Sequence, residues 1–189
     1  PMLAVQNIFF AIHDIETKKS ISFTILQNGT TGSGRKFIGK LIDADGIIDE
    51  ITAHARAAHQ LSPDVDTIIE IGGQDAKFTT LQNGRVTSST MNNVCAAGTC
   101  SFIEEQAARL GCNIADYARR TDNISAPMTS DRCTVFMERD INHFLSEGYN
   151  VNEVLAAALH SVRENYLLKV ATEKNIGKTI LFQGATAKN

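Results

Sequence analysis

The chain has 189 residues, of which 43% are hydrophobic, so its length and composition indicate a globular protein and exclude a disordered, collagenous or disulfide-rich chain. Its 18 basic and 21 acidic residues give a net charge of −3 without a basic run, which argues against a nucleic-acid partner. No apolar segment reaches the roughly 20 residues that span a bilayer, and residues 5–12 lack the cationic flank of a signal peptide, so we expect a cytoplasmic protein without membrane association.

The N-terminal part of the chain contains two runs of β-branched or aromatic residues, 7–12 and 20–26, separated by a polar segment. This pattern predicts a β-hairpin. A glycine-rich turn, TTGSGR, follows at residues 30–35. The alanine-rich segment 49–60 then predicts a helix that ends before Pro63.

The middle of the chain has the clearest strand pattern. Residues 67–71 are an apolar run that leads into Gly-Gly-Gln-Asp, and residues 77–81 and 86–91 also have strand character. Asn83 and Gly84 separate the last two runs, and Asn-Gly is typical of a tight two-residue hairpin. We therefore expect three sequential antiparallel strands.

Apolar residues repeat with helical spacing in the second half of the chain. They predict helices at residues 101–111, 135–146 and 151–174. Residues 179–183 predict a final strand, which enters the sequence GATAKN. Strands and helices together predict an α/β fold.

Gly72 and Gly73 end the first central strand and are followed by Gln74 and Asp75. Two glycines let the backbone approach a phosphate closely, and the Asp75 carboxylate can reach a metal ion or position a water molecule. A plain turn at the end of a strand is the alternative interpretation, and for the motif taken alone it is the more common one.

Four cysteines in a chain without an export signal favour thiols, metal ligands or core residues over disulfides. Cys95 precedes the helix expected near residue 101, and Cys133 directly precedes the helix expected near residue 135. The partial positive charge of a helix N-terminus favours thiolates, which ligate anionic iron–sulfur clusters. Two thiolates are half of a coordination sphere, so a cluster needs either Cys100 and Cys112 or a second subunit. Ordinary buried cysteines are the alternative.

Four segments in register resemble a known protein family. They are EIGGQDAKF at residues 70–78, MNNVCAAGTCSFIEEQAARLG at 91–111, DRCTVFMERD at 131–140 and FQGATAKN at 182–189. In order and spacing they resemble the activator ATPases of 2-hydroxyacyl-CoA dehydratases, a family that includes the ATPase subunits of benzoyl-CoA reductase. TTGSGR and EITAHARAAH at residues 50–59 also resemble family segments.

The resemblance implies an α/β fold of the actin-like ATPase class, represented mainly by its second lobe. Residues 1–65 are then the remnant of a first lobe, and residues 66–189 are the second lobe. Gln74 and Asp75 match catalytic positions of the second phosphate loop in this fold. The remaining positions matched to the binding of ATP or ADP with magnesium are Gly72, Gly73, Gly98, Thr99, Gly184, Ala185 and Thr186.

The resemblance also assigns roles to the cysteines. Cys95 and Cys133 match the two cysteines with which each subunit of a homodimer holds one shared four-iron, four-sulfur cluster. The family hydrolyses ATP to change the shape of the dimer and to pass a low-potential electron to a dehydratase partner. Cys112 matches no ligand and is expected to be a core or surface thiol. Cys100 stands where many members carry glycine, and we expect a neutral variant rather than a spare thiol near the cluster.

The chain also departs from the family pattern. Nothing among residues 1–29 resembles the first phosphate loop, and the chain stops directly after the adenosine motif. We therefore expect it to be part of a larger activator. We expect that larger protein, rather than this chain alone, to hydrolyse ATP. The alternative is a catalytically incomplete binding module whose cysteines hold a partner or a zinc ion. A small-molecule kinase of the same fold is disfavoured, because it has no use for cysteines at helix N-termini.

Overall fold

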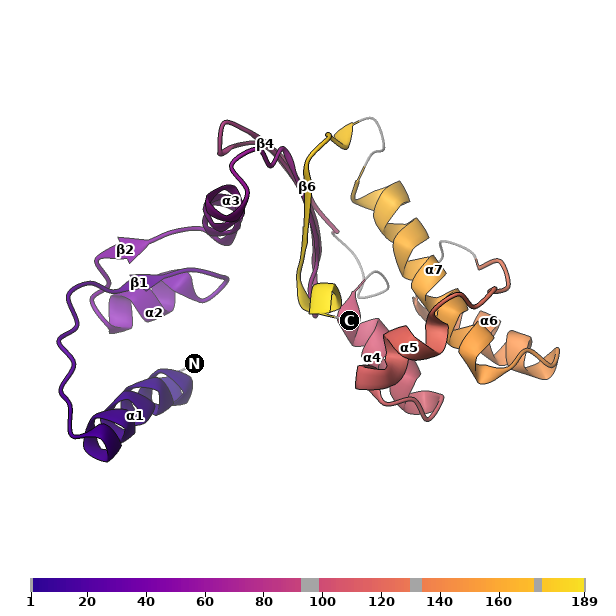
Figure 1. The fold of residues 1–189 in the computed structure, drawn as a ribbon, viewed down its shortest axis with the longest axis horizontal. Coiled ribbons are helices and arrows are strands. Elements are labelled where there is room, and N and C mark those ends of the chain that lie inside the picture. The colour runs from indigo at the N-terminus through magenta and orange to yellow at the C-terminus, as the bar shows by residue number, and fades with distance from the viewer. Residues whose placement is uncertain (1, 93–98, 130–133, 172–174, 189) are drawn as a thin grey trace. The chain divides into compact units, whose positions relative to one another are not determined.

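A computed structural model describes residues 2–92, 99–129, 134–171 and 175–188 of the chain (Figure 1). Contacts between residues divide the chain into two compact units, Pro1–Ala57 and Ala58–Asn189. The division falls inside helix α3 (Glu50–Leu61). This helix confirms the one predicted at residues 49–60. The assignment of residues 1–65 and 66–189 to two lobes stays a prediction.

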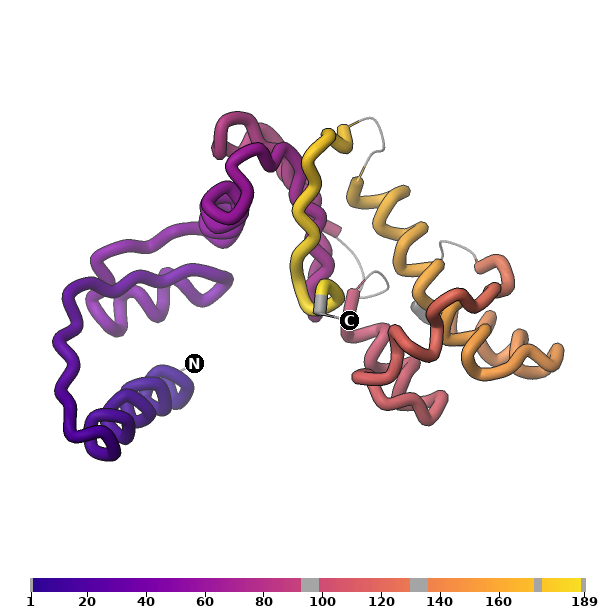
Figure 2. The backbone as a smooth tube through the Cα atoms, in the orientation of Figure 1, coloured from indigo at the N-terminus to yellow at the C-terminus, as the bar shows by residue number. Residues whose placement is uncertain are grey.

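The first unit contains helix α1 (Met2–Lys19), strand β1 (Gly29–Thr30), helix α2 (Arg35–Leu41) and strand β2 (Gly46–Ile47), as Figure 2 traces. The two short strands pair in parallel. Helix α2 lies close to both, because a Cβ atom at Gly39 would come within 2.8 Å of the side chains of Thr30 and Ile47. A larger residue at position 39 would require these side chains to shift.

The hairpin predicted at the N-terminus is wrong. Residues 7–12 lie inside α1, and residues 20–26 contain no strand. A short apolar run does not distinguish a strand from a helix, and here the helix is supported by polar pairs at helical spacing. His13 faces Glu16 at 3.6 Å, and Lys18 faces Asp14 at 4.0 Å.

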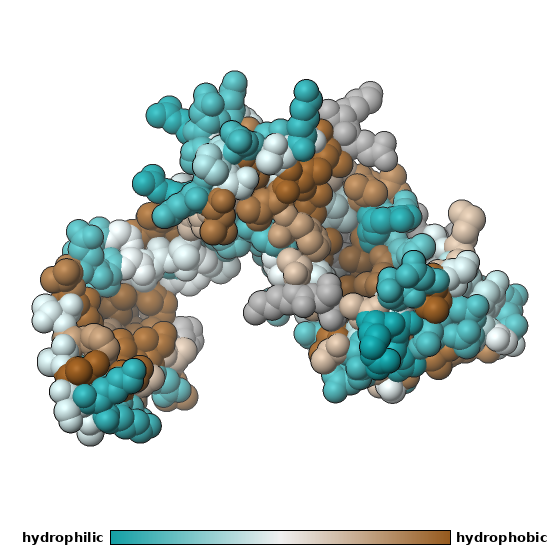
Figure 3. Space-filling view, in the orientation of Figure 1, coloured by the Kyte–Doolittle hydropathy of each residue, from teal (hydrophilic) through white to brown (hydrophobic). Residues whose placement is uncertain are grey.

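Helix α1 buries none of its residues. Apolar side chains therefore gather on the surface of this unit, which Figure 3 shows in brown around α1 and α2. None of the helices among the described residues combines the length and the apolar character that a membrane crossing requires.

The second unit is built on a four-stranded sheet with the order β5-β4-β3-β6. Strands β3 (Thr67–Ile71), β4 (Ala76–Gln82) and β5 (Arg85–Met91) pair antiparallel in sequence, which confirms the prediction. Strand β6 (Ile180–Gln183) pairs with β3 in parallel. Asn83 and Gly84 have φ angles of 51° and 73°, as the expected tight hairpin requires.

Helices α4 (Cys100–Arg109), α6 (Thr134–Ser146) and α7 (Val151–Lys169) confirm the three helices predicted in the second half. Helix α7 ends before residue 174, and residues 172–174 lie outside the described part. The short elements η2 (Ile114–Asp116), α5 (Tyr117–Thr121) and η4 (Ala185–Lys188) were not predicted. Each is too short to produce a hydrophobic period.

The core of this unit joins α7 to the sheet and to the neighbouring helices. The hydroxyl of Tyr166 donates to the carbonyl of Lys77 at 2.8 Å, and the hydroxyl of Tyr117 donates to the carbonyl of Leu155 at 2.9 Å. Burial raises the pKa of both tyrosines, so both hydroxyls remain donors. The largest fully buried apolar side chains of this core are Phe102, Met137, Ile141, Leu155 and Val154.

Asn150 begins α7 with a capping box. Its side chain accepts from the backbone N–H groups of Asn152 and Glu153 at 3.0 and 3.2 Å, and the Glu153 carboxylate accepts from the N–H of Asn150 at 2.8 Å.

We expect Asn150→Ala to lower the free energy of unfolding by about 1 kcal/mol, because two helix donors lose their partner. Urea denaturation checks this. Asn150→Asp keeps an acceptor and is the control, and equal stability of all three proteins would contradict the prediction.

Candidate functional site

The loop between β3 and β4 contains the four residues Gly72, Gly73, Gln74 and Asp75. The N–H of Gly72 donates to the carbonyl of Asp75 at 2.8 Å, and a Cβ atom at Gly72 would lie 2.9 Å from the same oxygen. Gly73 and Gln74 are exposed, and a Cβ atom at Gly73 would meet nothing within 4 Å. The loop is therefore tight at its base and open at its tip, as the approach of a phosphate requires.

The N-terminus of α4 is fixed to this loop. The backbone N–H groups of Cys100 and Ser101 donate to the carbonyls of Gly72 and Gly73 at 2.9 and 3.0 Å, and the Ser101 hydroxyl also donates to Gly73. The positive end of the helix dipole therefore lies next to the loop and favours an anion there.

Two further candidate residues lie before α4. Thr99 is its N-cap, and its side chain is fully buried, so the structure places it at the helix start and not at an open surface. Gly98 lies outside the described residues.

The turn after β6 packs against the end of β3. Gly184 has a φ angle of 104°, and a Cβ atom there would lie 2.3 Å from the carbonyl oxygen of Ile71. The hydroxyl of Thr186 donates to this same oxygen at 3.2 Å. Ile71 is the last residue before Gly72, so the turn at residues 184–186 and the loop at residues 72–75 meet at one peptide group.

A cavity of about 580 Å³ opens beside this junction. Its volume lies within the range of small-molecule sites, and its wall is mainly apolar. Ala185 joins Gly184 and Thr186 on one side, and α4, η2, α5 and α7 supply the rest through Cys100, Ile103, Glu104, Ile114, Ala115, Tyr117, Ala118 and Leu159. Sequence reasoning missed the wall residues of η2 and α5, because those elements are too short to have a periodic signal.

Asp75 is the charged group of the loop. Its side chain is 45% exposed, and one carboxylate oxygen lies 3.1 Å from the ammonium group of Lys77. A half-exposed carboxylate is the kind of oxygen ligand that Mg²⁺ prefers. The exposed Gln74 amide lies next to it in sequence and can hold a water molecule.

The described cysteines are Cys100 and Cys112, and both are buried. Burial, together with the Glu104 carboxylate 3.8 Å from the sulfur, raises the pKa of Cys100, so the cavity wall carries a neutral thiol. Cys112 lies in the hydrophobic core, which confirms a core thiol at this position.

Cys95 and Cys133, the predicted cluster ligands, lie outside the described residues. Helix α6 begins at Thr134, the first described residue after Cys133. Among residues 2–92, 99–129, 134–171 and 175–188, no group of three or more His, Cys, Asp or Glu side chains could hold a metal ion.

We expect Gly184→Ala to lower the free energy of unfolding by at least about 1 kcal/mol, since the new methyl group meets the Ile71 carbonyl and φ is positive. Gly73→Ala is the matched control and should change stability by less than about 0.5 kcal/mol, because the space around Gly73 is open. Thermal and urea unfolding measure both. Equal stability of the two variants would show that the turn does not pack closely on Ile71.

Comparison with known proteins shows which family the chain matches. Residues 3–189 match the model of the BadF/BadG/BcrA/BcrD ATPase family. An activator of lactoyl-CoA dehydratase from Anaerotignum propionicum is 35% identical over 175 residues, which cover 91% of this chain and 64% of the relative.

Two solved structures are similar in fold. The crystal structure of the Acidaminococcus fermentans (R)-2-hydroxyglutaryl-CoA dehydratase component A has a TM-score of 0.75 at 32% identity, covering 84% of this chain and 60% of that one. The activator of the 2-hydroxyisocaproyl-CoA dehydratase from Clostridium difficile with bound ADPNP has a TM-score of 0.78 at 31% identity, covering 94% and 66%. The chain spans about two thirds of the length of these relatives or somewhat less. The fold is that of the actin-like ATPases, and the chain belongs to the BadF/BadG/BcrA/BcrD ATPase family.

Proposed function

We propose that this chain is the nucleotide-binding part of an ATP-dependent activator for a 2-hydroxyacyl-CoA dehydratase-type enzyme. The observation that carries the proposal is the junction at the Ile71 carbonyl, which joins the Gly-Gly-Gln-Asp loop to the turn at Gly184 beside a cavity of about 580 Å³. The relatives support it, because they are named as dehydratase activators and one was solved with ADPNP.

Each part of the site has a task in this proposal. Gly72 and Gly73 let the backbone come close to the phosphates, and Asp75 and Gln74 hold the magnesium ion and a water molecule. Residues 184–186 and the apolar wall hold the adenosine group. The dipole of α4 adds a positive potential at the phosphate end.

The electron-transfer part of the proposal concerns the cysteines. We infer that Cys95 and Cys133 hold half of a four-iron, four-sulfur cluster that a homodimer shares, with a dehydratase-like enzyme as the electron acceptor in the cytoplasm. The cluster would supply one-electron chemistry at low potential. The start of α6 directly after Cys133 supports a stabilised thiolate at that position.

A second candidate is a catalytically incomplete module of the same fold that binds a partner or zinc through these cysteines. Its support is that nothing among residues 1–29 resembles the first phosphate loop of the family. The cysteine experiment below separates the two candidates.

The cavity gives a direct test of nucleotide binding. Ala118 is exposed on the cavity wall, so we expect Ala118→Trp to fill the space and to lower the affinity for fluorescent ADP by at least about tenfold. Ala57→Trp, at an exposed alanine on α3 that does not line the cavity, should bind like the wild type. If Ala118→Trp binds ADP as tightly as the wild type, the nucleotide does not occupy this cavity.

Anaerobic reconstitution with iron and sulfide tests the cluster. We expect about four irons per dimer, with visible absorption, in the wild type and none in the Cys95→Ala, Cys133→Ala double variant. Cys112→Ala is the control, because Cys112 lies in the core, and it should bind iron normally. A colourless monomer that takes up zinc through the same two cysteines would favour the binding module instead.

A further inference from the structure

A row of three polar side chains crosses the sheet beside the candidate site. Glu70 of β3 is the register partner of Lys77 on β4 and of Gln183 on β6. The Lys77 ammonium lies 3.3 Å from one Glu70 carboxylate oxygen, and the Gln183 amide donates to the other at 2.9 Å. Glu70 is therefore held from both neighbouring strands.

This row lies largely inside the protein. The side chains of Lys77 and Glu70 are only 7% and 10% exposed. A buried ion pair gives little net stability compared with apolar residues of similar size, so stability alone is a weak reason for its presence. A role in the arrangement of neighbouring groups is the stronger explanation.

Lys77 extends the row to the phosphate loop. Its ammonium also donates to Asp75 at 3.1 Å, and Asp75 is the half-exposed carboxylate of that loop. An ammonium group has three donors, so one lysine can bind two carboxylates at once. The backbone of Lys77 is fixed as well, because Tyr166 of α7 donates to its carbonyl.

The other end of the row reaches the turn. Gln183 is the residue before Gly184, whose backbone packs on Ile71, the residue after Glu70. The contacts therefore run without a break from Asp75 through Lys77 and Glu70 to Gln183. Asp75, at one end of the row, belongs to the loop at residues 72–75, and Gln183, at the other end, is the last residue of β6 and directly precedes the turn at residues 184–186.

We propose that Lys77 is a positioning residue that sets the direction of the Asp75 carboxylate and couples the loop at residues 72–75 to the turn at residues 184–186. The inference rests on one part of the proposed function, namely that these two segments hold the nucleotide. Lys77 itself contacts carboxylates of the chain, and it acts on the phosphate end through Asp75.

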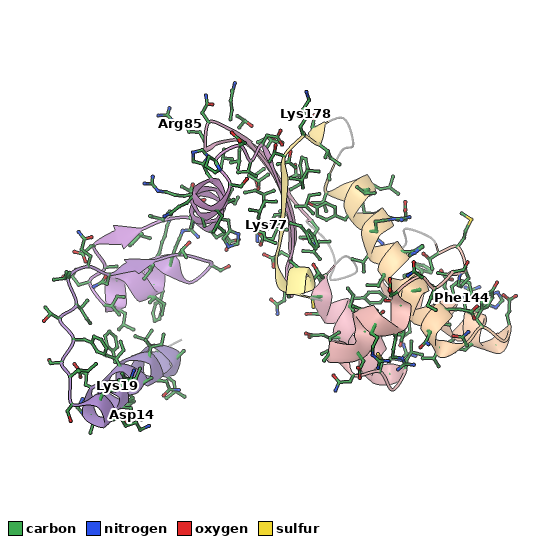
Figure 4. All side chains as sticks on the ribbon, viewed as in Figure 1. Asp14, Lys19, Lys77, Arg85, Phe144 and Lys178 are labelled. Atoms are coloured by element: carbon green, nitrogen blue, oxygen red, sulfur yellow. The ribbon has the colours of Figure 1, made fainter. Side chains whose placement is uncertain are left out.

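The test compares the Glu70→Gln, Lys77→Met double variant with Lys178→Met. The double variant removes both charges of the buried pair, so neither is left alone inside the protein. Lys178 is exposed and lies just before β6, at the opposite end of that strand from Gln183 (Figure 4). The Lys178→Met control therefore removes one lysine without changing the row. Circular dichroism first shows that each variant is folded.

The first measurement is amide hydrogen exchange in the chain without nucleotide. We expect exchange at residues 72–75 and 184–186 to become about tenfold faster in the double variant, within the usual range of coupling between contacting residues, and to stay unchanged in Lys178→Met. Unchanged exchange at both segments, or faster exchange at only one of them, would overturn the coupling.

The second measurement is ADP affinity with and without magnesium. We expect the ADP affinity of the double variant to fall about tenfold with magnesium and less than twofold without it. In an Asp75→Asn background, we expect the double variant to cause no further loss of ADP affinity. Equal losses with and without magnesium, or losses that add to that of Asp75→Asn, would overturn the role of Lys77 as a positioning residue. If the wild type binds no ADP, the proposed function fails, and the exchange result alone decides the coupling.

Discussion

The carbonyl oxygen of Ile71 is the point on which the candidate site depends. Ile71 is the last residue of β3, and its carbonyl oxygen accepts a hydrogen bond from Thr186. The same oxygen lies so close to Gly184 that there is no room for a side chain at position 184. Because β3 and β6 are parallel neighbours, their C-terminal ends lie at the same edge of the sheet. The pairing of these two strands thus brings together segments that are more than 100 residues apart in the sequence.

Around this junction, the polar and apolar parts of the site are separated. The loop end has the exposed Gly73, the start of α4 and the Asp75 carboxylate, whereas the cavity is lined mainly by apolar side chains. The buried Cys100 thiol does not disturb this division, since its raised pKa keeps it neutral. A ligand with a charged end and a flat apolar end suits the arrangement, and a nucleotide has both.

Much of the second unit could be predicted from local patterns. The runs that became β3, β4 and β5, the Asn83–Gly84 turn and the helical period of α7 all carried strong signals, since each element is long or has characteristic turn chemistry. The phosphate loop and the turn at Gly184 could be named as candidates from short motifs.

Other features could not be read from the sequence. The apolar run at residues 7–12 fits either a strand or a helix, and it lies inside helix α1. The wall formed by Ile114, Ala115 and Ala118 depends on where a short helix packs, which no local pattern specifies. The shared contacts of Glu70 with Lys77 and Gln183 depend on strand register, which is known only once the sheet is formed.

Gly184 and Gly73 differ in what surrounds their Cα atoms. At position 184 the excluding group is the chain's own backbone, whereas none of the described residues lies within 4 Å of a Cβ atom built at position 73. Natural selection would therefore preserve glycine 184 in any descendant that keeps this fold, with or without a ligand. Under the proposed function, only the ligand requires glycine at position 73, so a lineage that has stopped binding phosphate could carry another residue there.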